Sequence, residues 1–342
     1  KETQKMTHDF AYRYEKIRIE EMLMKFVLTQ PLDEAAMKVL KEAGADVYIA
    51  NSPDLPSYID KIQEADALVI RVGQCTAEVI DACPNLKVIG ITGVGYDRVD
   101  VAHASGKKLP VVFTPGANSL SVAEHTVALM FAAAKNLSES DEELRKGNWK
   151  IRDAGKAIEL SGKKVGIIGV GAIGAKVAAI CKGIGMETAG FSHSKNRAKV
   201  EAAGCEYYEN MDDLLRDCDF ITIHNPLTPE TTNMISSREL HLMKKSAILI
   251  NTSRGPIVNE KDLADALNND VIAAAGIDVF SEEPAVLDNP VFHCKNMIVT
   301  PHLAALTKEA KARMHVNSVK GCLAILNGTE WPDVVDKSVY KK

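Results

Sequence analysis

The stretch that decides the fold of this chain is residues 163–174, which read KKVGIIGVGAIG. It starts as an apolar run of strand length, continues as the glycine pattern GxGxxG, and leads into a helical segment that runs to residue 185. The first glycine permits a tight turn, the second lets the backbone approach a pyrophosphate, and the third lets the helix pack closely on the strand. Free N–H groups at the start of the helix would face the phosphates. The segment predicts a dinucleotide-binding turn, with candidate contacts at Gly169, Gly171, Ala172, Ile173 and Gly174.

Further strands are predicted on both sides of this turn. Short apolar runs lie at 187–191, 220–224, 247–251, 273–278 and 297–300 after it, and at 24–30, 46–50, 67–70 and 86–90 before it. Helical segments separate them, which is typical of parallel βαβ units. The runs are nearly continuous in apolar residues, as expected where helices cover both faces of a sheet. The sequence therefore predicts the α/β class, with two Rossmann-like, doubly wound parallel-sheet domains and a cleft between them.

Two long helices set the expected domain boundaries. Residues 119–137 have helical composition, and Ser121 and Glu124 have the spacing of a capping box near its start. A second helix is expected at 307–326 and should return to the first domain. We expect residues 1–118 plus 307–342 to form a substrate-binding, flavodoxin-like domain and residues 119–306 to form the dinucleotide-binding Rossmann domain. Residues 1–23 are charged and are expected to form an appendage.

Composition excludes several classes of protein. The 342 residues carry a net charge of −5, which argues against nucleic-acid binding because phosphate contacts need a basic face. No apolar stretch approaches the ~20 residues of a membrane helix. The seven cysteines form no CxxC pair and no zinc spacing, so we expect reduced thiols, a cytoplasmic location and no metal site.

The turn after the 187–191 strand bears on the choice of cofactor. An acidic residue about 20 residues beyond the glycines would bind a ribose diol. The segment 191–197 reads FSHSKNR and has no acid there. Small hydroxyls and basic side chains would instead attract a 2′-phosphate, which favours NADP(H), although NAD(H) remains possible if the turn is merely basic. The candidate contacts are Ser192, His193, Ser194 and Arg197.

Seven motifs, in order, carry a resemblance to a known family. They are GVGYD at 93–97, TPGAN at 114–118, the glycine turn at 169–174, HNPLT at 224–228, NTSRG at 251–255, DVFSEEP at 278–284 and PH at 301–302. From about residue 24 to residue 326 the chain resembles the D-isomer-specific 2-hydroxyacid dehydrogenases. The resemblance implies an oxidoreductase that transfers hydride between a nicotinamide cofactor and a small D-2-hydroxy acid or 2-keto acid.

Three residues are the expected catalytic group: Arg254, Glu283 and His302. The fork of a guanidinium suits the planar carboxylate of a 2-keto acid. Histidine as a residue type titrates near neutral pH, so it can give or take the carbonyl proton. The resemblance implies that Arg254 binds substrate and that Glu283, rather than its neighbour Glu282, pairs with His302. His224 is an alternative proton donor that we interpret mainly as a wall of the cofactor site.

The resemblance assigns further residues. Backbone N–H groups at Val72 and Gly73 are expected to bind the substrate carboxylate. Asn225, Pro226, Thr252 and Asp278 are expected to line the cofactor, and His125 is expected to be a helix residue whose hydrogen bonding is satisfied.

Substrate, role and assembly remain open at this level. Residues 71–76, RVGQCT, lack the lysine expected in phosphoglycerate dehydrogenases, which favours a hydroxypyruvate or glyoxylate reductase. D-3-phosphoglycerate dehydrogenase is the alternative, and a dinucleotide-sensing scaffold related to transcriptional corepressors is a second one. Segments 119–137 and 136–156 resemble the part that family members use to embrace a partner, so a homodimer is expected.

Overall fold

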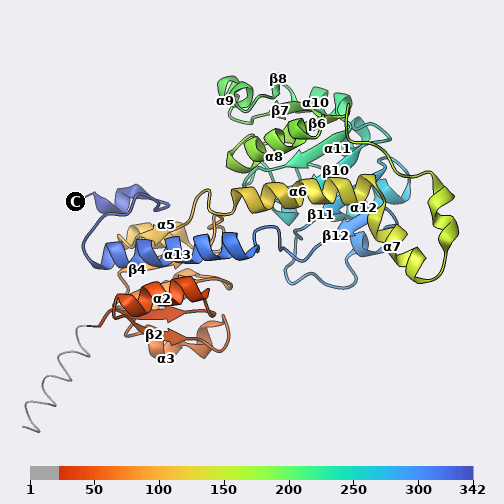
Figure 1. The fold of residues 1–342 in the computed structure, drawn as a ribbon. Helices are drawn as coiled ribbons and strands as arrows, with labels where there is room; N and C mark the ends of the chain where they lie inside the picture. Colours follow the sequence, from red (N-terminus) through yellow and green to blue (C-terminus); the bar gives the residue numbers. More distant parts are fainter. Residues whose placement is uncertain (1–22, 342) are drawn as a thin grey trace, which may run out of the picture. The chain divides into compact units, whose positions relative to one another are not determined.

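The computed structural model describes residues 23–341, which form two compact units (Figure 1). Unit 1 contains the described residues through Asn118 together with those from Lys308 onward, and unit 2 is Ser119–Thr307. The appendage predicted for residues 1–23 lies, but for its last residue, outside the described residues. The assignment of substrate to the first unit and dinucleotide to the second stays a prediction.

Unit 2, all of whose residues are described, is built on one parallel sheet of seven strands in the order β12-β11-β10-β9-β6-β7-β8. Strand order reverses between β6 and β9, so the carboxyl ends of these two strands flank a topological switch point, where ligands bind in open α/β sheets. The strands are β6 Lys164–Ile168, β7 Glu187–Phe191, β8 Glu206–Tyr208, β9 Phe220–Ile223, β10 Ile248–Asn251, β11 Ala274–Ile277 and β12 Met297–Val299.

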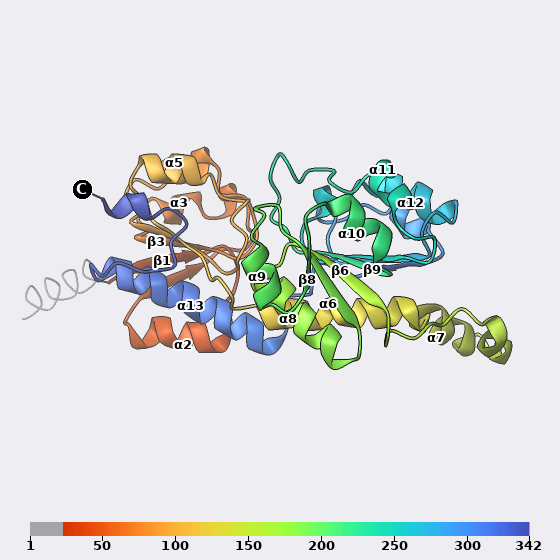
Figure 2. The ribbon, with the colours of Figure 1, turned by 90° about the horizontal axis from the view of Figure 1, so that it is seen from above.

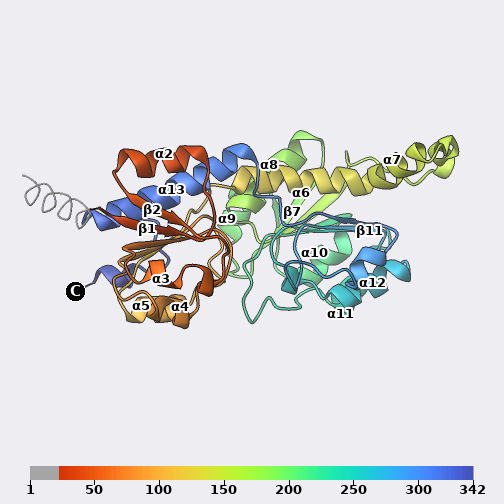
Figure 3. The ribbon, with the colours of Figure 1, turned by 90° about the horizontal axis from the view of Figure 1, so that it is seen from below.

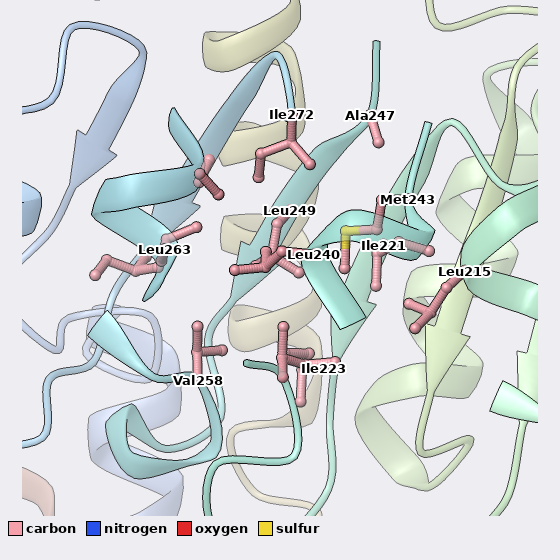
Figure 4. Packing of buried hydrophobic residues seen from close by; sticks show 14 of the residues in the cluster. Leu215, Ile221, Ile223, Leu240, Met243, Ala247, Leu249, Val258, Leu263 and Ile272 are labelled. Atoms are coloured by element: carbon pink, nitrogen blue, oxygen red, sulfur yellow. The ribbon is translucent and has the colours of Figure 1, made fainter. Parts of the chain in front are cut away.

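Helices cover both faces of this sheet (Figures 2 and 3). α6 (Ser119–Ala134) and α8 (Ala172–Gly183) cover one face; α10 (Met211–Asp217), α11 (Ser237–Leu242) and α12 (Glu260–Asn268) cover the other. Along β10, Ile248 and Ile250 pack in the cluster with α6, whereas Leu249 packs in the opposite cluster, as side chains that alternate across a strand must. Figure 4 shows Leu249 among its neighbours from α11 and α12. Each such buried side chain contributes about 1.5–3 kcal/mol relative to exposure.

Unit 1 has the strand order β2-β1-β3-β4-β5 in its described part, again all parallel, which is the order of flavodoxin-like sheets. One face is covered by α2 (Glu34–Glu42) and α13 (Lys308–Leu326), and the other by α3 (Ile59–Ile62), α4 (Ala77–Asp81) and α5 (Val101–Gly106) (Figures 2 and 3). α13 lies so close to β4 that a Cβ added at Gly90 would come within 2.7 Å of Ser318 Oγ. The strands are β1 Lys25–Leu28, β2 Asp46–Ile49, β3 Ala67–Ile70, β4 Val88–Ile91 and β5 Val111–Val112.

The predicted fold class is confirmed, and the helix predicted at 119–137 begins where expected, at Ser119, but its predicted end is wrong. It ends at Ala134, because Asn136 adopts a left-handed conformation with φ of 52°, which asparagine tolerates better than most residues, and α7 (Leu137–Arg145) begins after it. The capping box is also wrong. The helix already begins at Ser119, and the Ser121 hydroxyl donates to the carbonyl oxygen of Ala304 at 2.6 Å.

Two general properties follow from the described residues. None of their helices is both long and apolar enough to cross a membrane. All seven cysteines are free thiols and buried.

Candidate active site

Two glycines of the 169–174 turn are required by packing within the protein. Gly169 has a φ of 94°, and a Cβ there would overlap the Oδ1 atom of Asn225. A Cβ at Gly174 would lie 2.5 Å from the carbonyl oxygen of Gly169, so this glycine allows α8 to approach the end of β6. These contacts match the turn and packing roles predicted for the first and third glycines.

Neither packing nor backbone conformation within the protein requires a glycine at the middle position, Gly171. Its φ of −93° suits any residue, and a Cβ built on it meets no atom within 4 Å. It is the N-cap of α8 and has no side chain with which to cap the helix. The open space lies where helix N–H groups and the helix dipole favour an anion. The cradle therefore fits a dinucleotide pyrophosphate approaching the backbone at Gly171 and Ala172.

This difference gives a testable prediction. Gly171→Ala should leave the free energy of unfolding near the wild-type value but weaken NADPH binding by about tenfold or more, because its methyl group would occupy the phosphate position. Gly174→Ala should instead destabilise the fold by about 1–3 kcal/mol, through overpacking. Urea denaturation and fluorescence titration with NADPH measure the two effects. A Gly171→Ala protein that binds NADPH as tightly as wild type would refute the cradle.

The turn beside the glycine cradle lies between β7 and α9 (Arg197–Ala202). β6 and β7 are parallel neighbours, and Gly169 donates its N–H to the carbonyl oxygen of Phe191 at 2.9 Å, so the two turns share one edge of the sheet. Ser192 Oγ lies 3.0 Å from Ser194 Oγ. The Arg197 guanidinium lies 4.8 Å from the centroid of the Tyr207 ring, a cation–π contact that restricts where it can point. His193 is exposed.

The loop that carries Arg254 is held on both sides. It follows β10, whose last residue, Asn251, is buried, accepts from the Ser253 N–H at 3.0 Å and donates to the Arg254 carbonyl oxygen at 2.9 Å. A Cβ at Gly255 would overlap the backbone of Phe280, so this loop lies directly on the loop that follows β11. Arg254 and the segment leading to Glu283 are therefore fixed against each other by backbone packing.

The structure brings His302 and Glu283 together. His302 Nδ1 lies 2.9 Å from Oε1 and 2.8 Å from Oε2 of Glu283. Because Nδ1 is held by the carboxylate, Nε2 is the ring nitrogen that would exchange a proton with a ligand, and the imidazole side chain is 41% exposed. The carboxylate would stabilise the charged imidazolium and fix its orientation. This arrangement can deliver a proton to a bound oxygen.

His224 is unsuited to that task. Burial lowers the pKa of this histidine to about 3, so the ring stays neutral near pH 7. Its Nε2 lies 3.0 Å from Thr222 Oγ1, and its Nδ1 is shielded and has no hydrogen-bond partner among the described residues. A ring that cannot hold a second proton cannot act as the acid, which favours His302 over the alternative considered from the sequence.

The other predicted contact residues occupy varied settings, and their roles stay predictions. Asn225 is buried below the glycine turn, and its carbonyl oxygen accepts a hydrogen bond from Ser253 Oγ. Thr252 Oγ1 lies 2.8 Å from Thr126 Oγ1. Pro226 is exposed.

Val72 and Gly73 belong to unit 1, where they follow β3. The Val72 carbonyl oxygen accepts from Thr29 Oγ1 at 3.1 Å, and Gly73 has a φ of 103°. Their role toward a substrate carboxylate also stays a prediction.

The sequence predicted that the hydrogen bonding of His125 is satisfied, but it did not identify the residues that do so. His125 Nε2 lies 3.0 Å from Thr300 Oγ1, and Thr300 Oγ1 donates to Asp278 Oδ1 at 2.5 Å. A half-buried histidine needs a polar partner, but which residue serves depends on the tertiary fold. Asp278 was expected at the cofactor, and its carboxylate in this structure contacts the backbone of the loop that carries His302.

Comparisons with known proteins show which sequences and folds this chain is similar to. Residues 127–304 match the family model described as D-isomer specific 2-hydroxyacid dehydrogenase, NAD binding domain. The chain is 37% identical to a glyoxylate reductase of Aeropyrum pernix, across 92% of this chain and 96% of that protein. It is 42% identical to a D-3-phosphoglycerate dehydrogenase of Methanocaldococcus jannaschii, across 84% of this chain but only 55% of the relative. A solved acyclic imino acid reductase in complex with NADPH and D-Arg superimposes with a TM-score of 0.83 at 27% identity, over 92% of this chain and 100% of that one.

Proposed function

The chain belongs to the D-isomer specific 2-hydroxyacid dehydrogenase family, and from this premise we propose that it interconverts a small 2-keto acid and its D-2-hydroxy acid. The contact between His302 and Glu283 carries the proposal. Carbonyl reduction needs a proton, and an imidazole held by a carboxylate could donate it. Similarity to a glyoxylate reductase along nearly its whole length favours glyoxylate or hydroxypyruvate as substrate.

The chain's own residues divide the chemistry. Arg254 would bind the substrate carboxylate through its guanidinium and polarise the neighbouring carbonyl. His302, protonated with the support of Glu283, would give its proton to the carbonyl oxygen. When bound, the nicotinamide cofactor supplies the hydride that reaches the carbonyl carbon. In the reverse direction His302 would accept the hydroxyl proton.

We propose NADP(H) as the preferred cofactor. The support is the absence of a carboxylate in residues 191–197, the paired hydroxyls of Ser192 and Ser194, and the guanidinium of Arg197 on the Tyr207 ring. A relative of the same fold holds NADPH. A carboxylate in place of Ser192 would repel a 2′-phosphate and could bind a ribose diol instead.

The test is a panel of ketoacids against both reduced cofactors. Glyoxylate and hydroxypyruvate should give a kcat/KM with NADPH about tenfold or more above that with NADH, and Ser192→Asp should remove most of the difference. A wild-type preference for NADH contradicts the cofactor proposal. A preference for 3-phosphohydroxypyruvate favours the phosphoglycerate dehydrogenase alternative, and cofactor binding without turnover of any ketoacid favours the sensing scaffold.

Assembly and location complete the proposal. We propose a homodimer that uses α7 and the segment after it, where Leu137, Leu144 and Trp149 are more than half exposed. Light scattering measures the mass, and a monomer at micromolar concentration contradicts the proposed dimer.

Seven unpaired, buried cysteines favour a reducing compartment such as the cytoplasm. Fractionation of the native cell measures the location.

A further inference from the structure

We propose that His125 is a positioning residue, which acts through Thr300 and Asp278 to hold the loop that presents His302. The proposal rests on the proposed function for the role of His302, but the contacts that carry it are independent of any ligand. They join α6 to residues 300–304, which lie far from it in the sequence and within the same unit.

Both carboxylate oxygens of Asp278 accept hydrogen bonds from this loop. Oδ1 accepts from Thr300 Oγ1 at 2.5 Å and from the Leu303 N–H at 2.9 Å. Oδ2 accepts from the Ala304 N–H at 2.9 Å, and the backbone oxygen of Asp278 accepts from the His302 N–H at 2.7 Å. The side chain is fully buried, so these bonds replace water as the partners of the carboxylate.

These hydrogen bonds matter because the loop has an unfavourable backbone conformation. His302 has a φ of 49°, in the left-handed region that a residue with a Cβ seldom adopts. Such a conformation persists only where the surroundings over-determine it, and it occurs preferentially at functional sites. The bonds from residues 302, 303 and 304 to Asp278 hold it in place, together with the bond from the His302 N–H to the Thr300 carbonyl oxygen at 3.0 Å.

His125 sets the direction of the Thr300 hydroxyl. That hydroxyl has one hydrogen, which it donates to Asp278, so toward His125 it can only accept. His125 must then carry a hydrogen on Nε2, 3.0 Å from Thr300 Oγ1 and 3.6 Å from Asp278 Oδ1. The network assigns the tautomer, and it places an N–H donor where it stabilises both the hydroxyl and the carboxylate.

α6 holds the loop at a second point, one helical turn away. Ser121 Oγ donates to the Ala304 carbonyl oxygen at 2.6 Å. Ser121 and His125 are four residues apart, so they lie on the same face of the helix. The helix thereby contacts the segment around His302 at two points: through His125 at the Thr300 hydroxyl, and through Ser121 at the Ala304 carbonyl oxygen.

The expected consequence is a selective loss of turnover. Without the Thr300 hydroxyl, the loop should leave its left-handed conformation part of the time, and the His302 ring should spend less time where it can reach a substrate oxygen. Arg254 lies on a different loop, held by Asn251, so substrate binding should change little. A fall in kcat at a nearly constant KM is the expected sign.

The experiment compares Thr300→Val with Thr300→Ser in the full-length enzyme. Thr300→Val should lower kcat by about ten- to a hundredfold with KM within about twofold, and Thr300→Ser should restore most of the rate. Amide hydrogen exchange at Leu303 and Ala304 should be faster by about tenfold or more in Thr300→Val than in wild type. Thr188→Val is the control, since it removes a different threonine hydroxyl in the same unit, one that donates to the Gly204 carbonyl oxygen.

A second pair of variants tests the role of His125 directly and remains informative if Thr300→Val does not fold. His125→Gln keeps an N–H donor and should retain more turnover and slower exchange than His125→Leu. Wild-type kcat and wild-type exchange rates in either Thr300→Val or His125→Leu would overturn the proposal. If the wild-type enzyme reduces no ketoacid, the proposed function fails, and the exchange rates alone still decide whether this network holds the loop.

Discussion

Replacement of His302 by alanine is expected to lower kcat for ketoacid reduction by about a hundredfold or more, the usual size of a general-acid contribution. The imidazole is the group held by the Glu283 carboxylate, and the competing His224 is kept neutral by burial, which lowers its pKa to about 3. Steady-state kinetics with the best ketoacid of the panel and saturating NADPH measure the effect.

Two controls make this result specific. Glu283→Gln should cost less, about tenfold, because an amide oxygen can still accept from Nδ1 while its lack of charge no longer stabilises the imidazolium. His241→Ala removes an exposed histidine of the same unit, on α11, whose Nδ1 contacts the local carbonyl oxygen of Ser237, and it should keep the wild-type rate. His302→Ala with wild-type turnover would show that another group supplies the proton.

Replacement of Arg254 by glutamine is the second large effect that we expect, with kcat/KM for the ketoacid falling by about 10²–10⁴-fold. A hydrogen bond to a charged partner contributes about 1.5–3 kcal/mol, and the guanidinium can offer two to one carboxylate. Arg254→Lys should recover only part of the loss, because an ammonium keeps the charge but not the planar fork.

NADPH binding separates this effect from damage to the fold. Arg254 follows β10, and its loop is held by Asn251 and by the packing of Gly255 on Phe280, none of which needs the guanidinium. Fluorescence titration of Arg254→Gln should therefore give a wild-type dissociation constant for NADPH. If kcat/KM stays within about threefold of wild type, the carboxylate is bound elsewhere and the assignment fails.

The sequence predicted the strands well where burial alone determines them. The predicted run 67–70 coincides with β3, whose four residues ALVI are all apolar and buried, as expected of a parallel strand covered on both faces. The run predicted at 187–191 coincides with β7. β5 and β8 were not predicted. β5 has only two residues, which is too short for a pattern to show, and β8, at the sheet edge, reads EYY and is only partly buried.

The parts that the sequence could not supply depend on long-range contacts. Ser121 has the spacing of a helix cap, but in the folded chain its hydroxyl bonds Ala304, which is 183 residues away. His125 shows no ligand spacing, and its significance depends on a threonine 175 residues along the chain. Spacing within one element can place residues on a face, but only the tertiary fold decides which partner that face meets.

The discontinuity of unit 1 has a consequence for biosynthesis. Its sheet comes from the first part of the chain, whereas α13, which covers β4 and packs beside α2, is made only after the whole of unit 2. While the ribosome adds residues 119–307, the part of the first sheet that α13 will cover stays exposed, and α2 alone covers the rest of that face, so the nascent sheet is prone to aggregation. Unit 2 has no such delay, since it is one continuous stretch. We expect it to acquire protease resistance earlier during translation, and chaperones to engage the amino-terminal part until α13 emerges from the exit tunnel.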